Sequence, residues 1–205
     1  EEVWLADLPM PQSPVILDPE KLPFSFVFDG KPSSELLKTW KAERTSKELD
    51  EARTQHTLTF TEQATGLVLR CEAIEYHDFP TVEWTLYFKN AGTADSPIIE
   101  NIQALDLNME RGDTGEFLLH HNVGSPANGR DYGPLETHLD ANSTKRISAA
   151  GGRSTNSDMS YFNIESTVSD GLIAVVGWPG QWAADFVRDG AKGLRFTPQP
   201  DGTGL

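Results

Sequence analysis

Apolar and polar residues alternate along several stretches of this chain. Phe24–Phe28 places three phenylalanines on one side and ends at an Asp29-Gly30 pair, a dipeptide typical of tight turns between strands. The pattern also predicts strands whose inward side chains are Leu58 and Phe60, then Leu67, Leu69, Cys71 and Ala73, then Val82, Trp84, Leu86 and Phe88. Strands repeated at such short intervals predict an all-β fold, a large antiparallel β-sandwich with few or no helices.

Other stretches are less regular. Ser33–Lys41 is compatible with a short helix capped by Ser33 or Ser34, and equally with a twisted strand. Lys41–Arg53 is charged and poor in apolar residues, so we expect a solvated connection there. We expect extended segments at Ile98–Leu107, Phe117–His121 and Tyr161–Val168, and polar loops at Asn122–Gly133 and Gly151–Asp158.

Gly171–Trp182, GLIAVVGWPGQW, combines a strand signal with two tryptophans. The apolar run Leu172–Val176 predicts a buried strand, and we expect a turn at Ser169-Asp170-Gly171 before it. Pro179-Gly180 predicts a tight corner between Trp178 and Trp182, with a return strand over Ala183–Asp189. Two indoles at one corner either fill the core or form a stacking platform for a sugar ring.

The length suits one large all-β domain or two small ones, and no break in composition demands a second domain. The chain has 205 residues, of which 38% are hydrophobic. Five prolines precede Phe24, which predicts an irregular segment over residues 1–22 and one domain over residues 23–205. The single cysteine, Cys71, lies in an alternating apolar pattern, so we expect a buried packing residue.

The formal net charge of −14 makes binding to nucleic acid or to an anionic membrane surface unfavourable. No stretch approaches the ~20 apolar residues that a membrane span needs. We recognise no signal peptide in the sequence, and the compartment stays open between the bacterial cytoplasm and export.

The most polar candidate site is the segment His120–Asp131. Charged and amide side chains form paired hydrogen bonds with sugar hydroxyls, so these residue types fit carbohydrate binding. Asn, Gly and Pro also build turns, and a loop of this composition can be purely structural. Neighbouring strand residues point to opposite faces, so His120 and His121 are not expected to share a metal, and we predict no metal or cofactor. The candidate sugar ligands are His120, Asn128, Arg130, Asp131, Trp178 and Trp182.

Other enzyme classes receive less support. The chain has no GxSxG elbow and no phosphate-binding glycine motif, and Ser154 lacks a strand–turn–helix context. A sugar epimerase of the mutarotase type needs a general acid and a general base on either side of the ring. His120, His138 and Glu136 are the residues we nominate for that chemistry.

Several motifs in order resemble the N-terminal domain of α-galactosidase-like enzymes of glycoside hydrolase family 36. They are FSFVFDG, SSELLKTW, TGLVL, YHDFPTVEWTLYFKNAG, GRS and GLIAVVGWPGQW, and together they cover nearly the whole chain. The positions that match the family pattern are Trp84, Arg153, Ser154, Gly177, Trp178, Gly180 and Trp182.

The resemblance implies a supersandwich similar to the galactose mutarotase-like fold, followed in the family by a (β/α)8 barrel that carries the catalytic carboxylates. A barrel of that kind needs roughly 250 residues by itself, so this chain does not encode it. The matched positions are therefore family signatures and not catalytic residues. In that setting we expect at least one of Trp178 and Trp182 to pack in the core or against the barrel.

The function expected from this resemblance is a non-catalytic domain that packs on a C-terminal (β/α)8 catalytic domain and shapes the entrance for a galactoside substrate. The resemblance is also compatible with assembly of the protein into a homo-oligomer. A stand-alone carbohydrate-binding module is the alternative, and the epimerase is the third possibility.

Overall fold

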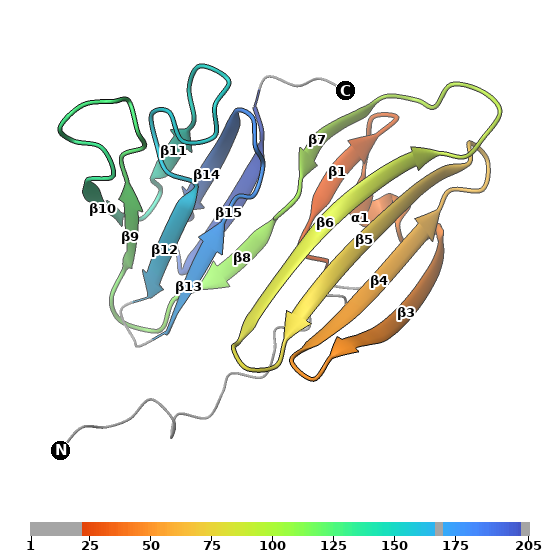
Figure 1. Cartoon of the computed structure of the whole chain (residues 1–205), viewed down its shortest axis with the longest axis horizontal. Helices are drawn as coiled ribbons and strands as arrows, with labels where there is room; N and C mark the ends of the chain where they lie inside the picture. The colour runs from red at the N-terminus through yellow and green to blue at the C-terminus, as the bar shows by residue number, and fades with distance from the viewer. Residues whose placement is uncertain (1–21, 167–169, 202–205) are drawn as a thin grey trace. The chain divides into compact units, whose positions relative to one another are not determined.

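The computed structural model describes residues 22–166 and 170–201, and within them the chain is almost entirely β-structure. Every paired strand for which a register is defined runs antiparallel, as the alternating pattern predicts. Figure 1 shows the strands in chain order. Residue contacts divide the chain into two compact units, one reaching to Ile98 and the other formed by Phe24–Val27 with the chain from Ile99 onward. One continuous domain over residues 23–205 stays a prediction, and residues 1–21 of the predicted irregular segment lie outside the described residues.

The first unit contains a four-stranded sheet of β3 (Lys41–Asp50), β4 (Arg53–Thr61), β5 (Leu67–Tyr76) and β6 (Thr81–Asn90), in that order. The predicted inward residues share one face because Leu58 pairs with Cys71 and Cys71 pairs with Leu86. Leu58, Phe60, Leu67, Leu69, Cys71 and Ala73 are all buried, which confirms the period-two interpretation. In β6 the alternation is present, but its inward residues are only half-buried.

The prediction of a solvated connection over Lys41–Arg53 is wrong. Lys41–Asp50 is strand β3, paired with β4 from Lys41 opposite Thr61 to Asp50 opposite Arg53. All ten residues of β3 are exposed, and the strand lies at the edge of its sheet. Ladder hydrogen bonds use backbone groups, so an edge strand that buries neither face needs no apolar alternation. The sequence pattern therefore had nothing to detect here.

The chain before this sheet follows its predicted course. In β1 (Ser25–Phe28) and just before it, Phe24, Phe26 and Phe28 are buried, and the turn has positive φ angles of 51° at Asp29 and 71° at Gly30. After β2 (Lys31–Pro32) comes the helix α1 (Ser33–Leu36), so the helical alternative is correct. Pro32 occupies its N-cap position without a side-chain bond, so neither serine is the cap.

The second unit contains two four-stranded sheets around one core. One sheet has the order β10 (Pro134–Leu139), β9 (Phe117–Asn122), β12 (Tyr161–Ser166) and β13 (Asp170–Val175). The other has the order β11 (Thr144–Ser148), β14 (Trp182–Arg188), β15 (Gly193–Pro200) and β8 (Leu107–Glu110). The extended run predicted over Ile98–Leu107 is split between β7 (Ile99–Gln103) and the start of β8.

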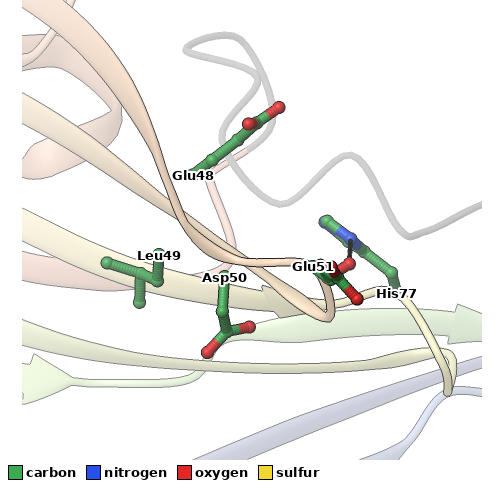
Figure 2. Close-up of a pocket in the computed structure, with 5 residues that line it drawn as sticks. All are labelled: Glu48, Leu49, Asp50, Glu51 and His77. Atoms are coloured by element: carbon green, nitrogen blue, oxygen red, sulfur yellow. Dashed lines mark hydrogen bonds between the residues drawn. The ribbon is translucent and has the colours of Figure 1, made fainter.

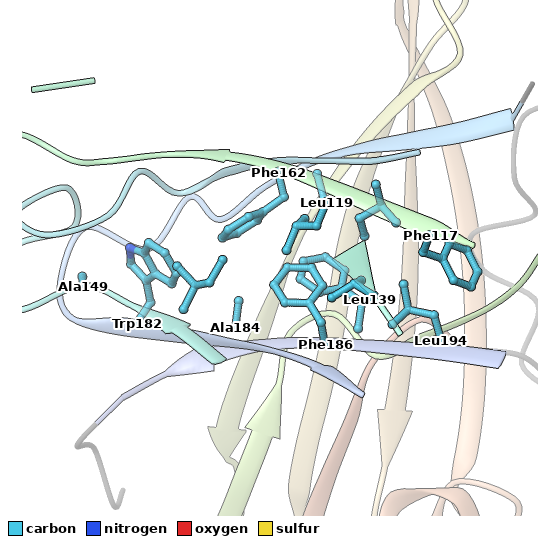
Figure 3. Packing of buried hydrophobic residues seen from close by; sticks show 13 residues of the cluster. Phe117, Leu119, Leu139, Ala149, Phe162, Trp182, Ala184, Phe186 and Leu194 are labelled. Atoms are coloured by element: carbon cyan, nitrogen blue, oxygen red, sulfur yellow. The ribbon is translucent and has the colours of Figure 1, made fainter. Parts of the chain in front are cut away.

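Aromatic residues from both sheets meet in this core, as Figure 3 shows. The ring of Phe162 packs edge-to-face against Trp182, Phe186 and Phe196, with centroids 5.7, 5.3 and 5.8 Å away. Such pairs add to the hydrophobic gain from burying each ring. The core fixes which face of each strand points inward, and therefore which residues face outward.

The structure corrects the interpretation of Leu172–Val176 as a buried strand. β13 is an edge strand, and Ile173 and Val175 are 73% and 54% exposed. Ala174 between them is buried. Asp170 and Gly171, predicted as part of a turn, already belong to this strand, while Ser169 lies outside the described residues. A continuous apolar run predicts burial on both faces, but the second unit covers this strand on one face only.

Candidate functional site

The GRS and GWPGQW motifs meet in the second unit. The indole N–H of Trp182 donates to the backbone oxygen of Ser154 over 2.7 Å, and the backbone N–H of Gly152 donates to Oε1 of Gln181 over 3.2 Å. The guanidinium of Arg153 donates to Asn156 within its own loop. The contacts of Gly152 and Ser154 anchor the loop of residues 151–158 to the start of β14. The two motifs therefore have a structural role in this unit.

The two tryptophans of the corner have different environments. Trp182 is 0% exposed, which confirms that one of the pair packs in the core and leaves that ring no open face for a sugar. Trp178 is 44% exposed. A Cβ atom on Gly180 would lie 2.9 Å from the Trp178 Nε1 atom, so the close approach of this ring explains a glycine there. Gly177 has open space around it, and Trp84 lies half-buried on β6 in the first unit.

The polar loop of residues 122–133 uses two of its candidate ligands to hold its own shape. Asp131 accepts the backbone N–H of Asn128 and the hydroxyl of Ser125, each over 2.9 Å. Asn128 accepts the backbone N–H of Arg130 over 2.9 Å, and the Arg130 side chain is exposed. Backbone hydrogen bonds from Gly124 to Ser157 and from Ser125 to Thr155 also join this loop to residues 151–158. Asn128 and Asp131 thus form the local turns that their residue types favour.

His120 and His121 point to opposite faces of β9, as predicted. His121 is buried, with 5% of its surface exposed, and its Nε2 lies 3.1 Å from the hydroxyl of Thr137. Its Nδ1 is buried without a hydrogen-bond partner among the described residues. Burial lowers the pKa of His121 below its ordinary value, because desolvation penalises the imidazolium form.

His120 lies on the outward side, between two carboxylates. Its Nε2 atom is 2.9 Å from Oε2 of Glu165 on β12, and its Nδ1 atom is 3.4 Å from Oε1 of Glu136 on β10. Glu136 and Asn163 stand directly opposite His120 in the register of the two neighbouring strands. His138, two residues beyond Glu136, faces the same way and is exposed. The sheet thus brings together the three residues nominated for epimerase chemistry.

The sequence interpretation missed Glu165, Asn163 and Tyr161 on this same face. The segment YFNIES carries the signal, because its polar residues alternate with the buried Phe162 and Ile164. Alternation alone shows that such residues face outward, but it does not show which side chains of other strands lie beside them.

The first unit holds a second polar cluster that the sequence interpretation did not consider. Nε2 of His56 lies 2.9 Å from Glu75, and Nδ1 of His56 lies 2.8 Å from the hydroxyl of Ser46. Beside this cluster lies an open depression lined by Glu48, Leu49, Asp50, Glu51 and His77, shown in Figure 2. The cluster bridges β3, β4 and β5 and ties the edge strand to the sheet.

Within residues 22–166 and 170–201, no group of three or more His, Cys, Asp or Glu side chains is arranged to hold a metal ion. In the same part of the chain, no helix has the length and apolar character that crossing a membrane requires.

Fold and register therefore define an all-β chain built from antiparallel sheets. No protein-family model matches the sequence, and no curated protein matches it significantly. Solved structures do match. The α-galactosidase AgaA from Geobacillus stearothermophilus, of glycoside hydrolase family 36, superimposes with a TM-score of 0.63 at 10% identity over 88% of this chain and 27% of that one.

Two further solved structures give the same result. The α-galactosidase from Lactobacillus brevis has a TM-score of 0.64 at 10% identity, and the galactosidase domain of the α-galactosidase-sucrose kinase AgaSK has 0.61 at 13% identity. Each comparison covers 88% of this chain and 26% of the other. The chain spans about a quarter of the length of these proteins. Its fold is that of part of a family 36 α-galactosidase, as the motif resemblance predicts.

Proposed function

We propose that this chain is the non-catalytic N-terminal β-domain of an α-galactosidase-like glycoside hydrolase. The main support for this proposal is the fold match to several α-galactosidases, which extends over 88% of this chain but only about a quarter of each of those proteins. A (β/α)8 barrel needs roughly 250 residues, so the catalytic centre belongs to a separate domain.

In this proposal the domain packs on the (β/α)8 domain and shapes the entrance to its active site. The substrate is then a galactoside. Support for this ligand class comes from AgaA variants whose structures hold stachyose and raffinose. The same packing is compatible with a homo-oligomer, and sedimentation measurements over a range of concentrations test for it.

Activity assays test the proposal directly. The 205-residue chain alone should not hydrolyse a nitrophenyl α-galactoside. When it is joined to the (β/α)8 domain encoded with it, kcat/KM for raffinose should rise more than kcat/KM for the nitrophenyl substrate, because an entrance contacts the longer sugar. Turnover by the chain alone that disappears in a variant lacking one of its own carboxylates overturns the proposal.

One observation favours a second candidate, sugar-ring epimerisation. His120 contacts both Glu136 and Glu165, which places an acid–base pair on an open sheet face. Polarimetry of freshly dissolved α-D-galactose tests it. Acceleration of mutarotation that is lost in His120→Ala supports an epimerase, and a rate equal to that of buffer excludes it.

A further inference from the structure

The outer face of the sheet β10-β9-β12-β13 divides into an apolar half and a polar half. In the apolar half, Tyr161, Ile173 and Val175 are 51%, 73% and 54% exposed. Tyr161 stands opposite Val175, and Asn163 stands opposite Ile173. The alternate residues Phe162 and Ile164 are at most 1% exposed and already supply the core, so the apolar residues outside are not needed for folding.

The polar half adjoins it across β9 and β10. His120, in register with Asn163, is held between Glu165 and Glu136 from the strands on either side. The 2.9 Å hydrogen bond with Glu165 orients the imidazole, whereas Glu136, whose side chain is 67% exposed, lies 3.4 Å from the other ring nitrogen. A site built on paired strands is more precise than one built on loops.

This division matches the chemistry of a pyranose chain. A sugar ring has an apolar face of C–H groups, which stacks on an aromatic ring, and a rim of hydroxyls, which donate and accept hydrogen bonds. Tyr161 offers an exposed ring, Asn163 offers both a donor and an acceptor, and the carboxylates accept hydroxyl protons. The net charge of −14 disfavours an anionic ligand, and of the remaining ligand classes a neutral oligosaccharide matches an exposed ring beside hydroxyl-binding groups.

We propose that this outer face binds a neutral galacto-oligosaccharide, with Tyr161 as the stacking platform, Asn163 and Glu165 as hydroxyl ligands, and His120 as the residue that orients Glu165. The choice of a galactoside as ligand rests on the proposed function, whereas the location of the site is inferred from the residues exposed on this sheet face. A nitrophenyl-galactoside assay tests the proposed function, and a binding titration tests the proposed sugar site. Failure of one proposal can therefore be distinguished from failure of the other.

The test is an NMR titration of the 205-residue chain with raffinose and stachyose to about 50 mM. We expect millimolar dissociation constants, with chemical-shift changes concentrated on β9, β12 and β13. Tyr161→Ala should weaken binding at least tenfold, and Asn163→Ala several-fold. Tyr87→Ala is the matched control, because Tyr87 is similarly exposed at 44% but lies on β6 of the first unit, and it should leave affinity unchanged.

Three outcomes overturn the proposal. The first is the absence of shift changes at 50 mM sugar. The second is binding that centres on Trp178 or Arg130 and is insensitive to Tyr161→Ala. The third is self-association of the chain that is abolished by Ile173→Glu, without any response to sugar, because the face is then a protein contact.

Discussion

The indole N–H of Trp182 donates to the backbone oxygen of Ser154 over 2.7 Å and so joins two motifs whose members are 28 residues apart. Trp182 is fully buried, and its ring also packs against Phe162 across the core. The two motifs are therefore coupled through one side chain. The loop of residues 151–158 depends on the core for its position, since part of its backbone is held by a core residue.

Trp182→Phe should destabilise the protein by about 2–4 kcal/mol. The change leaves a cavity in the core and removes the donor from the backbone carbonyl of the half-buried Ser154. Urea denaturation measures the loss. Trp178→Phe is the matched control, because Trp178 is 44% exposed, and it should change stability by less than about 1 kcal/mol. Equal losses in the two variants contradict the distinction between a core and a surface indole.

Arg188 should be the most costly charged residue to replace. Its side chain is 0% exposed, and its guanidinium donates to both carboxylate oxygens of Glu116, over 2.7 and 3.1 Å. Arg188→Met leaves Glu116 without its main partner and should cost about 3 kcal/mol or more in urea denaturation. Arg53→Met is the control, because Arg53 and its partner Asp50 are each 43% exposed to solvent, and it should cost much less stability than Arg188→Met. A loss at Arg188 no larger than at Arg53 refutes this ranking.

His121 should make the fold sensitive to mild acid. Burial holds its pKa below the ordinary value of 6.5, so the unfolded chain takes up the proton first as pH falls. The stabilisation from the neutral imidazole is present above about pH 6.5 and is lost as pH falls through the lowered folded pKa. Between pH 7.5 and 5.5 the urea midpoint should decline, and His121→Leu should flatten that decline. His138→Leu, on the exposed side of β10, should retain it, and a slope unchanged by His121→Leu disproves the assignment.

The Cys71 thiol should be inert in the folded protein. It is 0% exposed in the first unit, and burial raises its pKa to about 12, so almost no thiolate exists at pH 8. A chromogenic disulfide reagent should therefore report no free thiol per native chain and one per chain in denaturant, since Cys71 is the single cysteine. Rapid reaction of one thiol per native chain would contradict this prediction.

Residues that face the core are the ones whose positions follow from the sequence. Leu58, Phe60 and Cys71 were placed correctly because burial on one face of a strand imposes a period of two. The strand Lys41–Asp50 was missed because its contribution is a row of backbone hydrogen bonds, which any side chain accommodates. Ile173 and Val175 were expected inside because an apolar run does not reveal that its strand lies at an edge.

By itself the sequence determined the all-β class, the inward residues of the main strands and the motif order that resembles a family 36 domain. Gly171–Trp182 was recognisable as a strand followed by a corner, but only the tertiary structure decided that Trp182 is core and Trp178 is surface. Only the register placed His120 between Glu136 and Glu165, beside Asn163. The physical reason is that alternation follows from each strand's own contact with the core, whereas neighbours on a sheet face depend on pairing between segments far apart in the chain.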